Sequence, residues 1–272
     1  MRTHPFRIGV VIAAGFVASI GAQITVPSTP PPQTRAGGSI TAKAPSGPTP
    51  RKPNGQPDLT GVWLRRAGIV NIEQLLPKGE TLPFRPETLK RMSQLKSQDD
   101  PQLKCLPVAT PRSEPYPFRI VETPTHIFIV MEAVHGYRQV FMDGRKHPTG
   151  DDLQLSWQGH SIGHWEGNTL VVDTVGFNDL TWFDNWGHVH SDKMHVVERF
   201  TRVDLGHLNA SMLVDDPGAY SRPFTLNYTA ELMPNAELME YICDNEQDAP
   251  NIDAPADAAI DAEKLLKQGN SR

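Results

Sequence analysis

The fold of this chain is decided by the stretch SIGHWEGNTLVVDTVGF, residues 161–177. Two apolar runs, 161–165 and 169–177, flank the polar triplet Glu166-Gly167-Asn168, and a short glycine-containing loop between two such runs is typical of a β-hairpin. From this hairpin outward, apolar residues recur at a period of two, which indicates strands with one face buried. The sequence therefore predicts a β protein built from hairpins.

Further strands are predicted on both sides of this hairpin. They cover residues 59–63, 118–122, 126–132, 137–142, 194–203, 208–215, 224–232 and 237–242. The strands 118–122, 126–132 and 137–142 form a meander, and Asp204-Leu205-Gly206 closes another hairpin. The one internal helix is predicted from Pro86 to Lys96, because apolar residues follow the proline at helical spacing.

About ten short strands joined by tight turns must protect their edges, and closure into a barrel removes the edges altogether. We therefore predict a mainly β fold, an antiparallel up-and-down barrel of lipocalin-like type with one or two short helices. A two-sheet β-sandwich is the alternative, because strand period and turn spacing are the same in both architectures.

Both ends of the chain differ in composition from this β-rich part. Residues 1–22 have two arginines, an apolar run and small residues, as in a secretory signal peptide, and the run is too short to span a bilayer. The proline-rich segment 23–58 is predicted to be a disordered linker, because it has no apolar periodicity. We assign residues 59–246 to the barrel domain and 247–272 to a tail with a short helix at 254–267. The predicted location is the periplasm or the cell exterior, with no transmembrane segment after signal cleavage.

Charge and cysteine content narrow the class of protein further. The formal net charge is −5 at pH 7, and the basic residues are scattered, which argues against a nucleic-acid partner. An exported protein folds in an oxidising compartment, where the two cysteines, Cys105 and Cys243, are expected to form a disulfide.

Three motifs add a resemblance. They are Pro57-Asp58-Leu59-Thr60-Gly61-Val62-Trp63, Trp165-Glu166-Gly167-Asn168-Thr169-Leu170-Val171-Val172-Asp173-Thr174 with Gly176-Phe177-Asn178, and His195-Val196-Val197-Glu198-Arg199-Phe200. Together they resemble a group of exported bacterial proteins, which implies export and a common fold. The opening Gly-x-Trp strand followed by a meander is similar to the start of lipocalin-like barrels, which implies an enclosed small ligand.

The histidines that follow the central hairpin are candidate metal ligands. In an extended strand, the side chains of His188 and His190 point to the same side, about 6.5 to 7 Å apart. With His195 they would suit a transition metal such as zinc, iron or copper. The alternative is that these histidines are structural and form hydrogen bonds with Asp184, Asp192 and backbone carbonyls.

The same segment suggests an enzyme without a metal. A histidine would act as general base, a carboxylate would orient it, and an arginine would hold an anion or oxyanion. The candidate catalytic residues are His190, His195, Asp184, Glu198 and Arg199. A triad of Ser161, His160 and Asp173 is a weaker hypothesis, because the strained glycine elbow of such sites is missing.

Aromatic residues suggest a binding site for a small molecule. Two tryptophans flank Asp184 in a polar segment, and large flat side chains beside ionisable groups suit an apolar or aromatic ligand. The candidate ligand-binding residues are Trp182, Trp186, Tyr137, Arg138 and His164. The leading prediction is an exported small-molecule-binding barrel. The alternatives are an enzyme, a hydrolase, lyase or isomerase, and a structural or surface-interaction module.

Overall fold

The computed structural model of the chain describes residues 43–65, 71–112, 116–133 and 136–243. The predicted signal peptide, the first part of the predicted linker and the predicted tail helix lie outside these residues. Within the described part of the chain, no helix is both long and apolar enough to cross a membrane.

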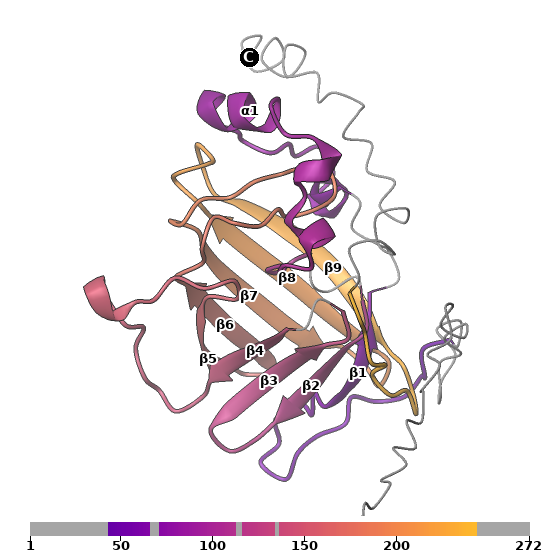
Figure 1. Cartoon of the computed structure of the whole chain (residues 1–272). Coiled ribbons are helices and arrows are strands. Elements are labelled where there is room, and N and C mark those ends of the chain that lie inside the picture. Colours follow the sequence, from indigo (N-terminus) through magenta and orange to yellow (C-terminus); the bar gives the residue numbers. More distant parts are fainter. Residues whose placement is uncertain (1–42, 66–70, 113–115, 134–135, 244–272) are drawn as a thin grey trace, which may run out of the picture. The chain divides into compact units, whose positions relative to one another are not determined.

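A closed β-barrel forms the centre of the molecule, so the prediction of a barrel is confirmed and the two-sheet sandwich is excluded (Figure 1). Nine strands of the described residues follow one another around it in sequence order, and β9 pairs with β1. They are β1 (Gly61–Leu64), β2 (Phe118–Glu122), β3 (His126–Met131), β4 (Tyr137–Phe141), β5 (His160–Glu166), β6 (Thr169–Val175), β7 (His195–Arg202), β8 (His207–Asp215) and β9 (Phe224–Leu232).

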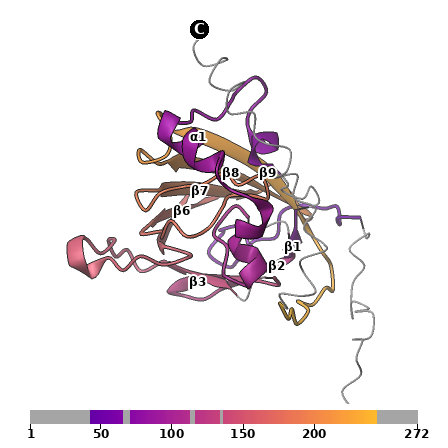
Figure 2. The same ribbon diagram turned by 45° about the horizontal axis from the view of Figure 1, so that its top comes forward.

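One pair of neighbouring strands departs from the predicted antiparallel pattern. β4 and β5 run parallel, with Val140 opposite Ser161, whereas the other neighbouring pairs are antiparallel. A ring of nine strands cannot alternate in direction all the way round, so it must contain a parallel pair. Parallel neighbours need a long crossover, and residues 142–159 supply it between β4 and β5. This crossover carries the 3-10 turn η4 (Gly150–Asp152) and stands away from the barrel wall in Figures 1 and 2.

The parallel pair also depends on a glycine. Gly163 of β5 faces inward, where a Cβ atom would lie 2.6 Å from the sulfur of Met142 and 2.8 Å from Cγ1 of Val140. Nonbonded carbon contacts lie at about 3.5 to 4.0 Å, so a larger side chain would push β4 and β5 apart.

The predicted strand at 237–242 is wrong. Residues 237–242 form no strand, because β1 already occupies the edge of β9 through the pairing of Trp63 with Leu232. The predicted helix is shorter than expected: α1 covers Pro86–Met92 rather than residues 86–96.

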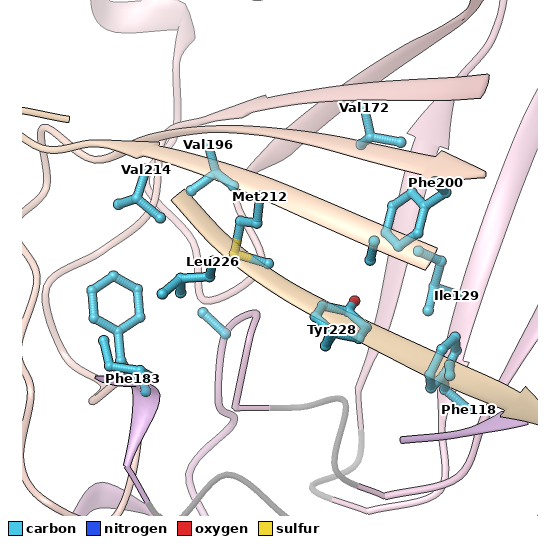
Figure 3. Packing of buried hydrophobic residues seen from close by; sticks show 14 of the residues in the cluster. Phe118, Ile129, Val172, Phe183, Val196, Phe200, Met212, Val214, Leu226 and Tyr228 are labelled. Carbon is cyan, nitrogen blue, oxygen red and sulfur yellow. The ribbon is translucent and has the colours of Figure 1, made fainter. Parts of the chain in front are cut away.

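Alternate side chains of the strands fill the interior of the barrel with a hydrophobic core (Figure 3). Ile129, Val172, Phe200, Met212 and Leu226, from five different strands, are each 2 % exposed or less. Burying such a side chain contributes about 1.5 to 3 kcal/mol. The apolar period of two in the sequence therefore marks the inward face of the wall.

One end of the barrel is covered by α1, the 3-10 turn η1 (Ile72–Leu75) and the segment 177–191 (Figure 1). We call these elements the cap. The Thr88 hydroxyl of α1 donates to the Ala219 carbonyl at 2.6 Å, and Met92 packs against Trp182 and Val189.

Residues 43–58, the described part of the predicted linker, pack against the barrel. Lys52 forms an ion pair with Glu122 of β2 at 2.6 Å, and the Thr49 hydroxyl donates to the Arg202 carbonyl at 3.2 Å. Proline does not prevent this packing, because an extended segment on a barrel surface needs few backbone donors.

The predicted disulfide is present. Cys105 and Cys243 are bonded, with 138 residues of separation along the chain. The bridge ties the segment after β9 to the 3-10 turn η3 (Pro101–Lys104), so it links residues before the second strand to residues after the last.

Candidate functional site

Asp184, a predicted catalytic residue, lies at the centre of the cap and is fully buried. Its carboxylate accepts hydrogen bonds from the backbone N–H groups of Ile72 at 2.7 Å and Trp186 at 2.9 Å. Nδ1 of His188 lies 2.5 Å from Oδ2 of the same carboxylate, and the His188 ring stacks on Phe84. Asp184 thus connects η1 to the segment 177–191 of the cap, as expected of a structural carboxylate.

Trp182, predicted for ligand binding, and His190, predicted for catalysis, are also enclosed in the cap, whereas the predicted ligand-binding residue Trp186 is half-buried. Trp182 packs on Met92 and Val189, and the ring of His190 lies 5.1 Å from that of Phe183. Burial lowers the pKa of His190 below its ordinary value, which keeps the ring neutral at pH 7. These side chains close the barrel instead of lining an open mouth.

The three histidines predicted as metal ligands are not brought together. His188 bonds to Asp184 inside the cap, His190 packs against Phe183, and His195 bonds to Asp173 on the outer wall. Among the residues that the structure describes, no group of three or more His, Cys, Asp or Glu side chains is placed to hold a metal ion. The predicted metal site of His188, His190 and His195 is therefore not formed.

Arg138 and Glu198, predicted for ligand binding and catalysis, form an ion pair inside the barrel. Nη1 of Arg138 lies 3.0 Å from Oε1 of Glu198, and Nη2 contacts the second carboxylate oxygen. Arg138 also donates to the Thr174 hydroxyl at 3.3 Å, which in turn lies 2.8 Å from that of Ser161. Ser161 therefore faces inward, away from His160 and Asp173, and the triad hypothesis is wrong.

Arg199 and His164 lie on the outer face of the barrel, on strands β7 and β5. Both contact Glu166: Nη2 of Arg199 is 2.5 Å from Oε2, and Nε2 of His164 is 3.1 Å from Oε1. These contacts lower the pKa of Glu166, with the Arg199 hydrogen bond as the largest cause. The three side chains form an exposed surface cluster.

The outer wall also carries a second polar cluster, made of one carboxylate and three histidines, two of which contact the carboxylate. Oδ1 of Asp173 (β6) lies 2.9 Å from Nε2 of His147 and 2.8 Å from Nε2 of His195. Nδ1 of His147, on the crossover, lies 2.9 Å from Nδ1 of His160 at the start of β5. We call these four residues the histidine relay. Of these residues, His195 was predicted as a catalytic residue and metal ligand, and His160 and Asp173 only as members of the weaker triad hypothesis.

Strand pairing explains why the relay forms. Ile162 pairs with Asp173, and Asp173 pairs with Val197. His160 lies two residues before Ile162, and His195 lies two residues before Val197. Side chains two residues apart on a strand share a face, so His160, Asp173 and His195 all point outward from three adjacent strands. The fourth member, His147, comes from the crossover that the parallel pair requires.

A cleft adjoins the relay. It lies between β4 and the crossover and has a volume of about 390 Å³. It is lined by Tyr137, Gln139, Phe141, Pro148, Asp152, Leu153, Gln154, Ser156, Gln158, Gly159 and His160. Tyr137 is 60 % exposed, and Phe141 stacks on His160 with ring centroids 5.1 Å apart. Of the predicted ligand-binding residues, Tyr137 lines this cleft.

The other residues of the cleft and the relay were not predicted as site residues, for two reasons. The outward parity of His160 and Asp173 could be recognised in the sequence once the register of the β5–β6 hairpin was assumed. His147 and Gln158 lie on the crossover, where no periodic pattern indicates which strand they will contact.

A hollow of similar volume, about 420 Å³, lies where residues 52–56 meet the β2–β3 turn and Trp165. It contains the ion pair of Lys52 with Glu122, and the Lys52 ammonium stands 4.7 Å over the Trp165 ring. Because its charged groups are already paired, we regard the cleft beside the histidine relay as the candidate site.

The fold and the site together define a closed, mixed β-barrel with a polar and aromatic cleft on its outer wall. Comparison of the chain with models of protein families, with curated proteins and with solved structures finds no match.

Proposed function

We propose that this protein is an exported binding protein for a small aromatic molecule, and that the ligand occupies the cleft between β4 and the crossover. The observation that carries the proposal is the composition of the cleft, which combines the exposed Tyr137 ring and the half-buried Phe141 ring with amide side chains. Its volume of about 390 Å³ is within the usual range for small-molecule sites, about 300 to 1,000 Å³.

Two side chains would provide the apolar surface. Tyr137 and Phe141, the first and last residues of β4, both lie on its outward face and line the cleft. A planar ligand would stack on the exposed Tyr137 ring, which contributes about 0.5 to 1.5 kcal/mol beyond area burial. The Phe141 ring is already contacted by the Arg145 guanidinium and the His160 ring, so it would border the ligand.

Polar side chains border the same cleft. Gln139, Gln154 and Gln158 line it with amides, and His160 lines it with an imidazole. The Gln158 amide is held in place, because its Nε2 donates to the Val108 carbonyl at 2.6 Å. A ligand with a hydrogen-bonding group beside its ring would suit this lining.

Export is part of the proposal. It is supported by the sequence of residues 1–22, which has the layout of a signal peptide, and by the disulfide between Cys105 and Cys243. Stable disulfides are typical of oxidising compartments.

Binding is tested with indole and p-cresol as probes, added to the ¹⁵N-labelled full chain. We expect amide shifts to concentrate at Gln139, Gln158 and His160. A Tyr137→Ser variant should weaken binding about 2- to 12-fold, the equivalent of the stacking contribution.

The control variant is Leu213→Ser. Leu213 is also an exposed apolar residue of the outer wall, 42 % accessible, but lies on β8 and outside the cleft. Equal effects of the two substitutions, or shifts spread over the whole surface, would contradict a site at Tyr137.

A further inference from the structure

The hydrogen bonds of the histidine relay determine where its protons lie. Nε2 of His147 is 2.9 Å from the Asp173 carboxylate, and a carboxylate accepts, so His147 carries its proton on Nε2. Neutral His147 then has a lone pair on Nδ1, and Nδ1 of His160, 2.9 Å away, must be the donor. Neutral His160 therefore carries its proton on Nδ1 and a lone pair on Nε2.

That lone pair belongs to a residue that lines the cleft. Within the part of the chain that the structure describes, Nε2 of His160 forms no hydrogen bond, and this atom is not fully buried. A ligand that pairs with this lone pair must present an O–H or N–H group beside its aromatic ring.

We propose that the cleft takes a phenol and that the histidine relay removes the proton from its hydroxyl group. The phenol O–H bond breaks and its proton goes to Nε2 of His160. The proton on Nδ1 of His160 passes to Nδ1 of His147. The products are a phenolate in the cleft and an imidazolium on His147, whose Nε2–H remains bonded to the Asp173 carboxylate. The ligand class rests on the proposed function.

In this step His160 is the catalytic residue, because it touches the ligand. His147 and Asp173 are positioning residues: they fix the tautomer of His160 and stabilise the charge that forms. An imidazolium 2.9 Å from a carboxylate is stabilised by a charge-assisted hydrogen bond. His195 bonds to the same oxygen at 2.8 Å, so it competes with His147 for the negative charge of Asp173.

The surrounding charges agree with a neutral His160 in the resting state. Burial is the largest cause that lowers the pKa of His160, and the charge of the neighbouring Arg145 lowers it as well. Arg145 is itself paired with Asp143 at 2.6 Å. Asp152 lines the opposite side of the cleft, on the crossover.

The first experiment reads the tautomers directly. Long-range ¹H–¹⁵N correlation spectra of the full chain at neutral pH should show His160 protonated on Nδ1 and His147 protonated on Nε2. Protonation of His160 on Nε2 in the neutral state would overturn the relay, whatever the cleft binds.

The second experiment uses 4-nitrophenol and 4-nitroanisole, which differ in the hydroxyl proton. The phenolate of the first probe absorbs visible light and its neutral form does not, so protonation of the bound probe can be followed against pH. We expect both probes to bind, and the apparent pKa of bound 4-nitrophenol to fall by about one unit or more, because an imidazolium forms nearby.

Variants distinguish the relay from simple binding. In His147→Phe the ring is kept but the relay is broken, so both probes should still bind while the pKa shift of 4-nitrophenol is lost. His207→Phe is the matched control, since it removes a histidine that bonds to Asp204 at 2.9 Å on β8, away from the cleft; it should keep the shift.

The outcomes separate the two proposals. If neither probe binds, the binding function and the relay both fail. If both bind equally and 4-nitrophenol keeps its solution pKa, the cleft is a binding site and the relay is overturned. A shift that survives in His147→Phe would also overturn it.

Discussion

Replacing Glu198 by leucine would test whether the ion pair inside the barrel is structural. Glu198 and Arg138 are 0 % and 1 % exposed, and two hydrogen bonds join them. The leucine would remove the Glu198 carboxylate from the buried Arg138 guanidinium, which would keep its hydrogen bond to the Thr174 hydroxyl. Leaving one charge of a buried pair without its counterion costs about 3 to 5 kcal/mol. We therefore expect Glu198→Leu to lower the free energy of unfolding by that amount.

Replacing both partners should undo most of this loss. An apolar pair such as Arg138→Met with Glu198→Leu removes the desolvation cost together with the attraction, and such replacements are often neutral or stabilising. The exposed pair of Arg199 with Glu166 is the control, because a surface ion pair contributes only about 0 to 1 kcal/mol.

The measurement is equilibrium unfolding in urea of the disulfide-bonded protein, with the single and double variants in one double-mutant cycle. A loss below about 1 kcal/mol in Glu198→Leu would refute the structural role. Binding of 4-nitroanisole by the folded double variant is the second readout. Its loss would show that Arg138 and Glu198 act in ligand binding, contrary to their position inside the barrel.

Three further predictions concern the bridge and the cap. Replacing Cys105 and Cys243 by alanine should lower the free energy of unfolding in urea by about 5 kcal/mol in the chain-entropy model, given their separation of 138 residues; a loss under about 2 kcal/mol would contradict this. Asp184→Ala should cost about 3 kcal/mol, because it removes the acceptor of three backbone donors and of the His188 ring; unchanged amide exchange in the cap would refute it. His190 has a lowered pKa in the folded state, whereas the unfolded chain binds its proton at about 6.5, so its contribution is complete above pH 6.5 and is lost as the pH falls below that value. A His190→Leu variant should therefore show a smaller loss of stability on acidification, and an identical pH profile would count against the assignment.

The hairpins of the fold could be predicted from sequence because their signals are local. The central hairpin was expected at 161–165 and 169–177 and is found at His160–Glu166 and Thr169–Val175. In contrast, the parallel pairing of β4 with β5 has no turn signal, because the paired strands are separated by an 18-residue crossover, 142–159. The prediction of a strand at 237–242 was wrong for a related reason: apolar alternation does not reveal whether a sheet edge is free to pair with another strand.

The candidate site was harder to predict, because it depends on which face each residue occupies. His188 and His190 were expected at an open mouth of the barrel, but both are buried in the cap. There His188 bonds to Asp184 and His190 packs against Phe183. His195 was predicted as a catalytic residue and metal ligand, and the structure places it beside Asp173 of the neighbouring strand. Such a contact needs the strand register, which the sequence alone does not supply.

The number of strands connects the fold to the proposed activity. With an even number of strands, all neighbours could be antiparallel, and a tight turn would be enough to join β4 to β5. With nine, one junction must be parallel, and the crossover it requires brings His147 to His160 and Asp173 and builds one wall of the cleft. The hydrophobic core and the Arg138–Glu198 pair meanwhile occupy the inside of the barrel. Ligand chemistry is therefore expected on the outer wall, at the parallel junction, rather than in the enclosed cavity that resemblance to lipocalin-like barrels implies.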